Sequence, residues 1–193
     1  MIAIEGPNGS GKTTLCGRLA QVLHAPRCLG TDEAWCAEPF KSRMIREAEW
    51  HASALFFLSG CLEQMRLLRA RPESVTVMDR SLWSTLAVHG AESAERLQTL
   101  LQVLEPLASQ VRVPDLTLVL EASFTVCQSR IARKSGISRA LDQLTATPDF
   151  HACEQAFYQW LGEQRPEVLF LDVSNVGADE AARQAMVLLS GKI

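Results

Sequence analysis

Short apolar runs alternate with longer amphipathic stretches along the chain, and residues that favour turns separate them. This alternation is typical of β-α units that build a parallel sheet, so it predicts an α/β fold. Strands are expected at about residues 1–5, 26–29, 75–79, 115–121 and 167–172. The length of 193 residues and the 47% share of hydrophobic residues suffice for one core, so residues 1–193 are predicted to form a single domain.

Apolar residues recur with helical spacing between the predicted strands. The clearest stripe runs through Leu15, Leu19, Val22 and Leu23, and it marks one helix face as part of the core. Helices are expected over residues 11–24, 40–71, 81–110, 123–135, 149–164 and 177–190.

Prolines mark the ends of three predicted helices. Pro72, Pro114 and Pro166 stand shortly before the last three predicted strands, where a proline cannot continue a helix.

The segment from Lys134 to Asp149 departs from this pattern. Gly136, Pro148 and the hydroxyl residues between them interrupt any long helical period. We therefore expect a mobile flap between two helices.

The net charge of −3 gives the chain no overall basic surface, so binding to nucleic acid is not expected. Six cysteines contain no Cys-x-x-Cys pair and no metal-ligand spacing, which favours reduced thiols. No uncharged apolar run approaches the ~20 residues of a membrane span, and the first residues show no signal-peptide pattern. These features predict a cytoplasmic protein that is neither exported nor inserted into a membrane.

A glycine-rich loop lies between the first predicted strand and the first predicted helix. It fits the pattern G-x-x-x-x-G-K-[ST] in the strand–loop–helix context that the Walker A motif requires. Its backbone N–H groups and the helix N-terminus are suited to bind nucleotide phosphates. Lys12 is expected to reach the β- and γ-phosphates, and Thr13 to bind Mg²⁺. The predicted nucleotide-binding residues are Gly6, Asn8, Gly9, Ser10, Gly11, Lys12, Thr13 and Thr14.

Two charged residues end the third predicted strand. Asp79 and Arg80 are expected at the carboxyl edge of the sheet, where open α/β sheets bind their ligands. Asp79 is predicted to bind Mg²⁺ as a Walker B-like acid, and Arg80 to contact an acceptor or a transferring phosphate. In a purely structural alternative, Asp79 is the N-cap of the helix that starts near Ser81.

Glu38 precedes Pro39 in the loop after the second predicted strand. Proline favours the first turn of a helix and an extended conformation for the residue before it, which presents the Glu38 carboxylate at the sheet edge. Glu38 is a candidate base for an attacking hydroxyl, although a glutamate in a surface loop is an equally good interpretation.

Arg130, Arg133 and Lys134 lie together on a predicted helix, and Arg139 follows in the flap. Arginines delivered by a closing lid stabilise the charge of phosphoryl transfer and exclude water. These residues are therefore predicted to close over the nucleotide; a solvated basic helix face is the alternative.

A pocket for the base of the acceptor has four candidate residues, which otherwise belong to the core: His89, Trp83, Phe56 and Phe57.

Several of these motifs together resemble the thymidylate kinase family and its deoxynucleoside kinase relatives. The resemblance rests on Ile4-Glu5-Gly6 with the glycine-rich loop, Glu38-Pro39, Asp79-Arg80-Ser81 and Pro114-Asp115-Leu116-Thr117-Leu118, and it extends through Tyr158 to Leu171-Asp172.

The resemblance implies a three-layer P-loop NTPase fold, with a five-stranded parallel sheet, helices on both faces and a helical lid at about residues 130–148. It also implies ATP and Mg²⁺, a small nucleotide or nucleoside acceptor, and often a homodimer. We therefore expect a thymidylate-kinase-like phosphotransferase that moves the γ-phosphoryl group of ATP to a nucleoside monophosphate such as dTMP. The predicted catalytic residues are Lys12, Glu38, Asp79, Arg80, Arg130, Arg133 and Arg139.

The acceptor side departs from the thymidylate kinase pattern. That family usually carries Arg-Glu-Pro-Gly-Gly, whereas residues 37–40 read Ala-Glu-Pro-Phe, and residues 55–61 lack an arginine usual there. Those arginines hold the acceptor monophosphate in the family, so Arg43 or Arg46 must replace them if dTMP is the substrate. His89 stands where a glutamine is expected to read thymine.

The Glu-Pro pair near a tryptophan, and Arg-Ser after the acid, are more similar to deoxynucleoside kinases. A deoxynucleoside kinase, or a kinase for another small metabolite, is therefore the second hypothesis, with Glu38 as the base toward a hydroxyl.

A hypothesis of another class is a P-loop switch or regulatory protein, or a decayed kinase kept as a scaffold. The chain has no Asn-Lys-x-Asp motif, which weighs against a guanine-nucleotide switch. Lys12, Thr13, Asp79 and Arg80 are all present, which weighs against a decayed kinase.

Overall fold

The computed structural model describes residues 1–70 and 75–192, and of residues 137–140 only the backbone. Five parallel strands form one sheet in the order β2-β3-β1-β4-β5. The strands are β1 (Ile2–Glu5), β2 (Arg27–Leu29), β3 (Val77–Asp79), β4 (Leu116–Glu121) and β5 (Val168–Asp172). All five predicted strands are thus confirmed, whereas Pro72 lies outside the described residues.

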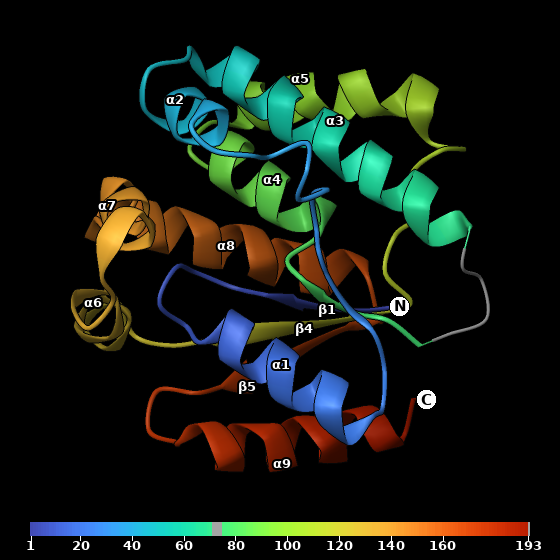
Figure 1. Ribbon diagram of the computed structural model, residues 1–193, viewed down its shortest axis with the longest axis vertical. Helices are drawn as coiled ribbons and strands as arrows, with labels where there is room; N and C mark the ends of the chain where they lie inside the picture. Colours follow the sequence, from blue (N-terminus) through green and yellow to red (C-terminus); the bar gives the residue numbers. More distant parts are fainter. Residues whose placement is uncertain (71–74, 193) are drawn as a thin grey trace.

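Helices cover both faces of the sheet, which confirms the predicted α/β fold (Figure 1). Helices α1 and α9 pack on one face, α3, α4, α5 and α8 lie on the other, and α6 and α7 lie beside the end of the sheet. The helices are α1 (Lys12–Val22), α2 (Phe40–Arg46), α3 (Trp50–Arg69), α4 (Leu82–Gly90), α5 (Ala94–Leu104), the 3-10 helix η1 (Glu105–Leu107), α6 (Phe124–Ala132), α7 (Gly136–Leu144), α8 (Pro148–Gln164) and α9 (Ala178–Ser190).

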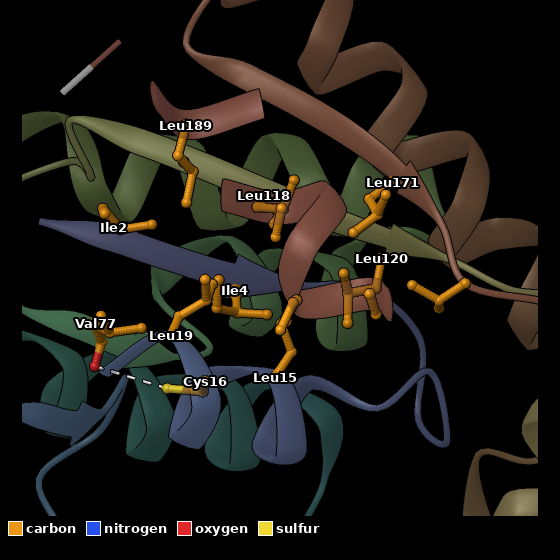
Figure 2. Packing of buried hydrophobic residues seen from close by; sticks show 14 of the residues in the cluster. Ile2, Ile4, Leu15, Cys16, Leu19, Val77, Leu118, Leu120, Leu171 and Leu189 are labelled. Atoms are coloured by element: carbon orange, nitrogen blue, oxygen red, sulfur yellow. Dashed lines mark hydrogen bonds between the residues drawn. The ribbon is translucent and has the colours of Figure 1, made fainter. Parts of the chain in front are cut away.

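The two faces of β1 belong to different parts of the core. Ile2 and Ile4 pack against Leu15 and Leu19 of α1 (Figure 2), whereas Ala3 faces the other side of the sheet. Because side chains alternate along a strand, Glu5 follows Ala3 onto the face that α4 and α8 cover. Glu5 is fully buried there, at the carboxyl end of the strand.

Two predicted helices are each divided in the structure. The segment 40–71 forms α2 and α3, with a break at residues 47–49 that contains neither glycine nor proline. The segment 81–110 forms α4, α5 and η1, and the Ser93 hydroxyl caps α5 by accepting a 3.4 Å hydrogen bond from Arg96 N–H. The prediction of two long helices is therefore wrong, because local caps and tertiary packing end them.

The segment 134–149 is interrupted as predicted, at residues 133–135 and 145–147, but it also contains a short helix, α7, between these breaks. Gly136 begins α7 with φ of +66°, and Pro148 occupies the first position of α8, where its missing N–H costs nothing. Thr147 caps α8 by accepting a 3.2 Å hydrogen bond from Phe150 N–H. Gly136 and Pro148 therefore start helices, whereas Thr145 and Thr147 lie in the non-helical connection between α7 and α8.

The position of β1 defines the place where a ligand is expected. From β1 the chain passes to β2 and β3 on one side of the sheet, and β4 and β5 lie on the other. The carboxyl end of β1 is therefore the switch point at which such sheets bind ligands. Among the described residues, no helix combines the length and the apolar composition that crossing a membrane requires.

Candidate active site

The loop between β1 and α1 adopts a backbone conformation that only glycines allow without strain. Gly6, Gly9 and Gly11 have φ values of +125°, +84° and +107°. A Cβ at Gly6 would lie 2.4 Å from the carbonyl oxygen of Leu120, and one at Gly9 would lie 2.4 Å from that of Cys127. The loop therefore packs directly against β4 and α6. Gly6 and Gly9 are required by both conformation and space, and Gly11 by conformation alone.

Lys12 is folded back onto this loop. Its Nζ donates hydrogen bonds of 2.7 Å to the carbonyl oxygens of both Gly6 and Pro7, and the residue is 5% exposed. Burial, reinforced by the charge of Arg80, lowers the pKa of the Lys12 ammonium. The two carbonyl oxygens hold the Lys12 amine at the loop, and an incoming anion would favour its charged form, against the effect of burial.

The residues of the loop fit a bound phosphate group. Ser10 is 1% exposed, and its Oγ has no hydrogen-bond partner among the described residues. Thr13, at the start of α1, is exposed, and α1 has no acidic residue in its first turn. Free donors around a helix N-terminus, without an opposing carboxylate, are suited to bind an anion.

A cavity of about 450 Å³ extends from the loop toward α6 and α9. Arg130 spans it, since its guanidinium donates to Ser10 O at 3.0 Å and to Val173 O at 2.7 Å. Arg133 and Lys134 also line it, whereas the side chain of Arg139 lies outside the described part of α7. The opposite wall is formed by Val173, Val176, Gly177, Ala178 and Ala181. The sequence analysis missed this apolar wall, although it directly follows β5.

Asp79 and Arg80 point to different sides of the sheet edge. Asp79 is 5% exposed, and its Oδ2 accepts a 3.0 Å hydrogen bond from Arg27. It does not line the cavity, in contrast to Arg80. Ser81, not Asp79, caps α4 by accepting from Trp83 N–H at 3.2 Å, so the interpretation of Asp79 as an N-cap is wrong.

The guanidinium of Arg80 is fixed by two side chains. Arg80 has φ of +71°, which turns the backbone sharply between β3 and α4. Its Nη1 donates to Ser84 Oγ at 3.3 Å, and its Nη2 donates to Asn8 Oδ1 in the loop. Arg80 is therefore brought to the phosphate loop as the sequence predicts.

A buried carboxylate network that the sequence analysis missed supports this arrangement. Glu5 accepts hydrogen bonds from the hydroxyls of Ser81 at 2.6 Å, of Ser84, and of Tyr158 at 3.1 Å. Burial raises the pKa of Glu5, and the hydroxyls of Ser81 and Ser84 partly oppose the shift. In the sequence, this network is indicated only by Glu5 itself, a charged residue at the end of an otherwise apolar strand.

A second buried carboxylate, Glu154, lies one helical turn before Tyr158 on α8. It is 3% exposed. Burial raises its pKa, and the charges of Lys12 and Arg80 partly oppose this shift. Glu154 is therefore a buried carboxyl group behind the loop, close enough to Lys12 and Arg80 to feel their charges, and no motif indicates it.

Glu38 lies at the start of α2, on the side of the molecule that carries α7 and the phosphate loop (Figure 1). Its carboxylate is exposed and accepts hydrogen bonds from Ser42, from N–H at 3.1 Å and from the hydroxyl. The Ser42 hydroxyl lowers the pKa of Glu38. Glu38 is thus an accessible anion that also caps its helix.

Three of the four proposed acceptor-side rings gather between α3 and α4. Phe57 stacks on His89 with ring centroids 5.7 Å apart, and Phe56 contacts Phe57 edge-on at 5.1 Å. Burial lowers the pKa of His89 to about 4, which keeps its imidazole neutral. Trp83 is instead 7% exposed in the core beneath Arg165, so it is not part of this cluster.

Comparison with known structures supports the fold. A thymidylate kinase from Candida albicans shares 19% identity, with a TM-score of 0.72, over 98% of this chain and 90% of that chain. Deoxyadenosine kinase from M. mycoides, solved with bound dATP, shares 16% identity, with a TM-score of 0.73, over 98% of each chain. Its structure with bound dCTP gives 15% identity and a TM-score of 0.70, again over 98% of each chain.

Sequence comparison decides the family. No curated protein sequence matches the chain. The model of the deoxynucleoside kinase family, however, matches residues 2–189, which is nearly the whole chain. This confirms an ATP-dependent nucleoside or nucleotide kinase, the broader class that the sequence motifs predicted. By its sequence over residues 2–189 and by its P-loop site, this chain belongs to the deoxynucleoside kinase family.

Proposed function

We propose that this protein transfers the γ-phosphoryl group of ATP, bound with Mg²⁺, to the 5′-hydroxyl of a deoxynucleoside. The family match over residues 2–189 carries this proposal. A contact on the acceptor side, described below, supports a hydroxyl rather than a phosphate as the acceptor group.

The donor side of the proposed site holds the triphosphate. Lys12 and the loop N–H groups would bind the β- and γ-phosphates, and Arg130 and Arg133 would neutralise charge that develops on the transferred group. Mg²⁺, when bound, neutralises the phosphates; Thr13 and Asp79 are its proposed protein ligands. The described residues contain no cluster of three or more acidic, His or Cys ligands. This agrees with Mg²⁺ that arrives with the nucleotide and keeps most of its ligands from phosphate and water.

Glu38 is the proposed base. Its carboxylate is exposed and ionised at neutral pH, so it has free lone pairs for the hydroxyl proton. The Ser42 hydroxyl that lowers the pKa of Glu38 also makes it a weaker base. The acceptor hydroxyl oxygen forms a bond to the γ-phosphorus as the bond to the β,γ-bridging oxygen breaks. The hydroxyl proton passes to Glu38, and ADP leaves with the electron pair of the broken bond.

Arg43, on α2, is engaged in an ion pair with Glu47 at 3.5 Å. A monophosphate acceptor bound by Arg43 would require this ion pair to break. An uncharged nucleoside has no such requirement, so this contact favours it.

A monophosphate kinase is the second candidate, and one observation favours it. The charges of Lys41 and Arg46 lie close enough to Glu38 to lower its pKa, so two cations stand beside the proposed base. In that case Arg46 would bind the acceptor phosphate, as the sequence suggested.

An acceptor panel distinguishes the two candidates. ADP formation would be measured with each deoxynucleoside, its 5′-monophosphate and the matching ribonucleoside, with Lys12→Ala as the inactive control. We expect turnover with at least one deoxynucleoside. Glu38→Gln should lower kcat by at least about 100-fold, whereas Glu33→Gln, at an exposed glutamate of the same loop, should not. Turnover with monophosphates alone would overturn the proposal in favour of the second candidate.

A further inference from the structure

The side chain of Asn8 connects two segments that are far apart in the sequence. Its Oδ1 accepts a hydrogen bond from Arg80 Nη2, and its Nδ2 donates one of 3.0 Å to Thr145 Oγ1. Asn8 belongs to the phosphate loop, Arg80 follows β3, and Thr145 follows α7. One amide group therefore joins the loop, the start of α4 and the connection between α7 and α8.

The chemistry of the partners fixes which end of the amide faces which residue. A guanidinium can only donate hydrogen bonds, so the carbonyl oxygen of Asn8 must face Arg80. The amide nitrogen then faces Thr145, whose hydroxyl oxygen accepts. The two contacts are consequently linked, because turning the amide to suit another partner at one end would break the contact at the other.

Arg80 depends on Asn8 for its position. Apart from Asn8, its guanidinium donates among the described residues only to Ser84 Oγ, at 3.3 Å. Ser84 Oγ itself donates to Glu5, so this serine is already held by the buried carboxylate. Asn8 is therefore the contact that draws the guanidinium toward the phosphate cavity, which Arg80 lines.

The other partner, Thr145, belongs to a segment attached at several points. Gln128 of α6 donates to Ala146 O at 3.1 Å, and Asp142 pairs with Lys134 at 2.6 Å. These contacts hold residues 142–146 to α6 and to the residues that directly follow it, whereas the Asn8–Thr145 bond attaches the segment to the phosphate loop.

We propose that Asn8 is a positioning residue that couples the docking of residues 142–146 to the placement of Arg80 at the phosphate cavity. When residues 142–146 move away from the loop, Asn8 Nδ2 loses Thr145 as its acceptor. The Asn8 amide is then free to turn, so its Oδ1 no longer holds the Arg80 guanidinium in one orientation. The inference rests on the proposed function only where Arg80 acts on the transferred phosphoryl group.

Substitution of Thr145 gives the sharpest test, because Thr145 does not contact Arg80. The NMR signal of the Arg80 guanidinium would be assigned with Arg80→Lys and followed in the nucleotide-free protein. Asn8→Ala and Thr145→Val should both shift it in the same direction. Thr125→Val, at an exposed threonine of α6, serves as the matched control and should leave it unchanged. An unchanged Arg80 signal in Thr145→Val would overturn the coupling, whichever acceptor the enzyme uses.

Amide exchange and kinetics supply the other two readouts. Both variants should raise the exchange rates of the amides of residues 142–146 by about 3- to 10-fold, which corresponds to one lost hydrogen bond. They should lower kcat by about the same factor, with the KM for ATP changed less than about two-fold. Normal exchange in Asn8→Ala, or a normal kcat despite raised exchange, would contradict the inference. If the unmodified protein turns over no deoxynucleoside, only the proposed function fails, and the NMR result still decides the coupling.

Discussion

The hydroxyl of Tyr158 donates a 3.1 Å hydrogen bond to Oε2 of Glu5, across 153 positions of the sequence. This contact joins α8 to the end of β1, immediately before the phosphate loop. Tyr158 and Glu5 are 1% and 0% exposed, so the bond is shielded from water. The bond thereby anchors β1, where the phosphate loop begins, to α8, the helix that also carries Glu154.

Tyr158→Phe should reduce the stability of the protein without opening a cavity. The substitution removes one donor to Glu5 and keeps the ring, so the free energy of unfolding should fall by about 1–2 kcal/mol. Urea unfolding measures this change. Thr99→Val removes an exposed hydroxyl that donates to Glu95 O within α5 and should cost clearly less. Equal midpoints for Tyr158→Phe and the unmodified protein would show that the bond contributes nothing.

Gly9→Ala and Gly11→Ala should differ, although both glycines belong to the phosphate loop. Both have positive φ, but a Cβ at Gly9 would meet the backbone of Cys127, whereas one at Gly11 has nothing within 4 Å. Gly11→Ala therefore carries only the backbone penalty of about 1–2 kcal/mol. Gly9→Ala must also displace α6 from the loop. We expect a larger loss of ATP affinity for Gly9→Ala in calorimetry, and the opposite order would contradict the described packing.

Substitutions of Asp79 and Arg27 distinguish a structural role of Asp79 from a role in binding Mg²⁺. Asp79→Asn should lower kcat by at least about 100-fold if this carboxylate binds Mg²⁺. Arg27→Met leaves Asp79 buried without its partner, and should lower the free energy of unfolding by about 1–2 kcal/mol. The estimate is below that of a fully buried pair because the side chain of Arg27 is 37% exposed. If Asp79→Asn stays active and is merely less stable, Asp79 is only the partner of Arg27.

The buried Glu154 predicts how stability depends on pH. Its pKa is raised above the ordinary value of 4.5, so the folded state binds a proton that the unfolded state has released. Stability should therefore decrease as pH rises from about 4.5 toward neutrality, by up to about 1.4 kcal/mol for each increase of one in pH. Glu154→Gln should flatten this dependence in urea unfolding between pH 5 and 7.

Glu163→Gln provides the control for that measurement. Glu163 lies on the same helix but is exposed, so its substitution should leave the slope unchanged. Glu5 also has a raised pKa and keeps contributing to the slope in both variants. A slope that Glu154→Gln leaves as steep as before would show that Glu154 does not titrate in this range.

Local patterns were sufficient to predict the strands and the phosphate loop. The apolar runs that end at Glu5, Asp79 and Asp172 are strands because burial on both faces of a parallel sheet demands continuous apolar residues. The helix boundaries were less predictable. Nothing in the sequence of residues 47–49 marks the break between α2 and α3, and Gly136 and Pro148 start helices instead of ending them.

The sequence by itself determined the five strands, the phosphate loop with Lys12 and the position of Arg80 at the end of a strand, because each of these depends on residues that are neighbours along the chain. Only the tertiary structure decided that Asp79 pairs with Arg27, that Asn8 bridges Arg80 and Thr145, and that Glu5 and Glu154 are buried behind the loop. These contacts join residues from separate strands and helices. Their partners are selected by the packing of those elements, which no spacing along the chain records.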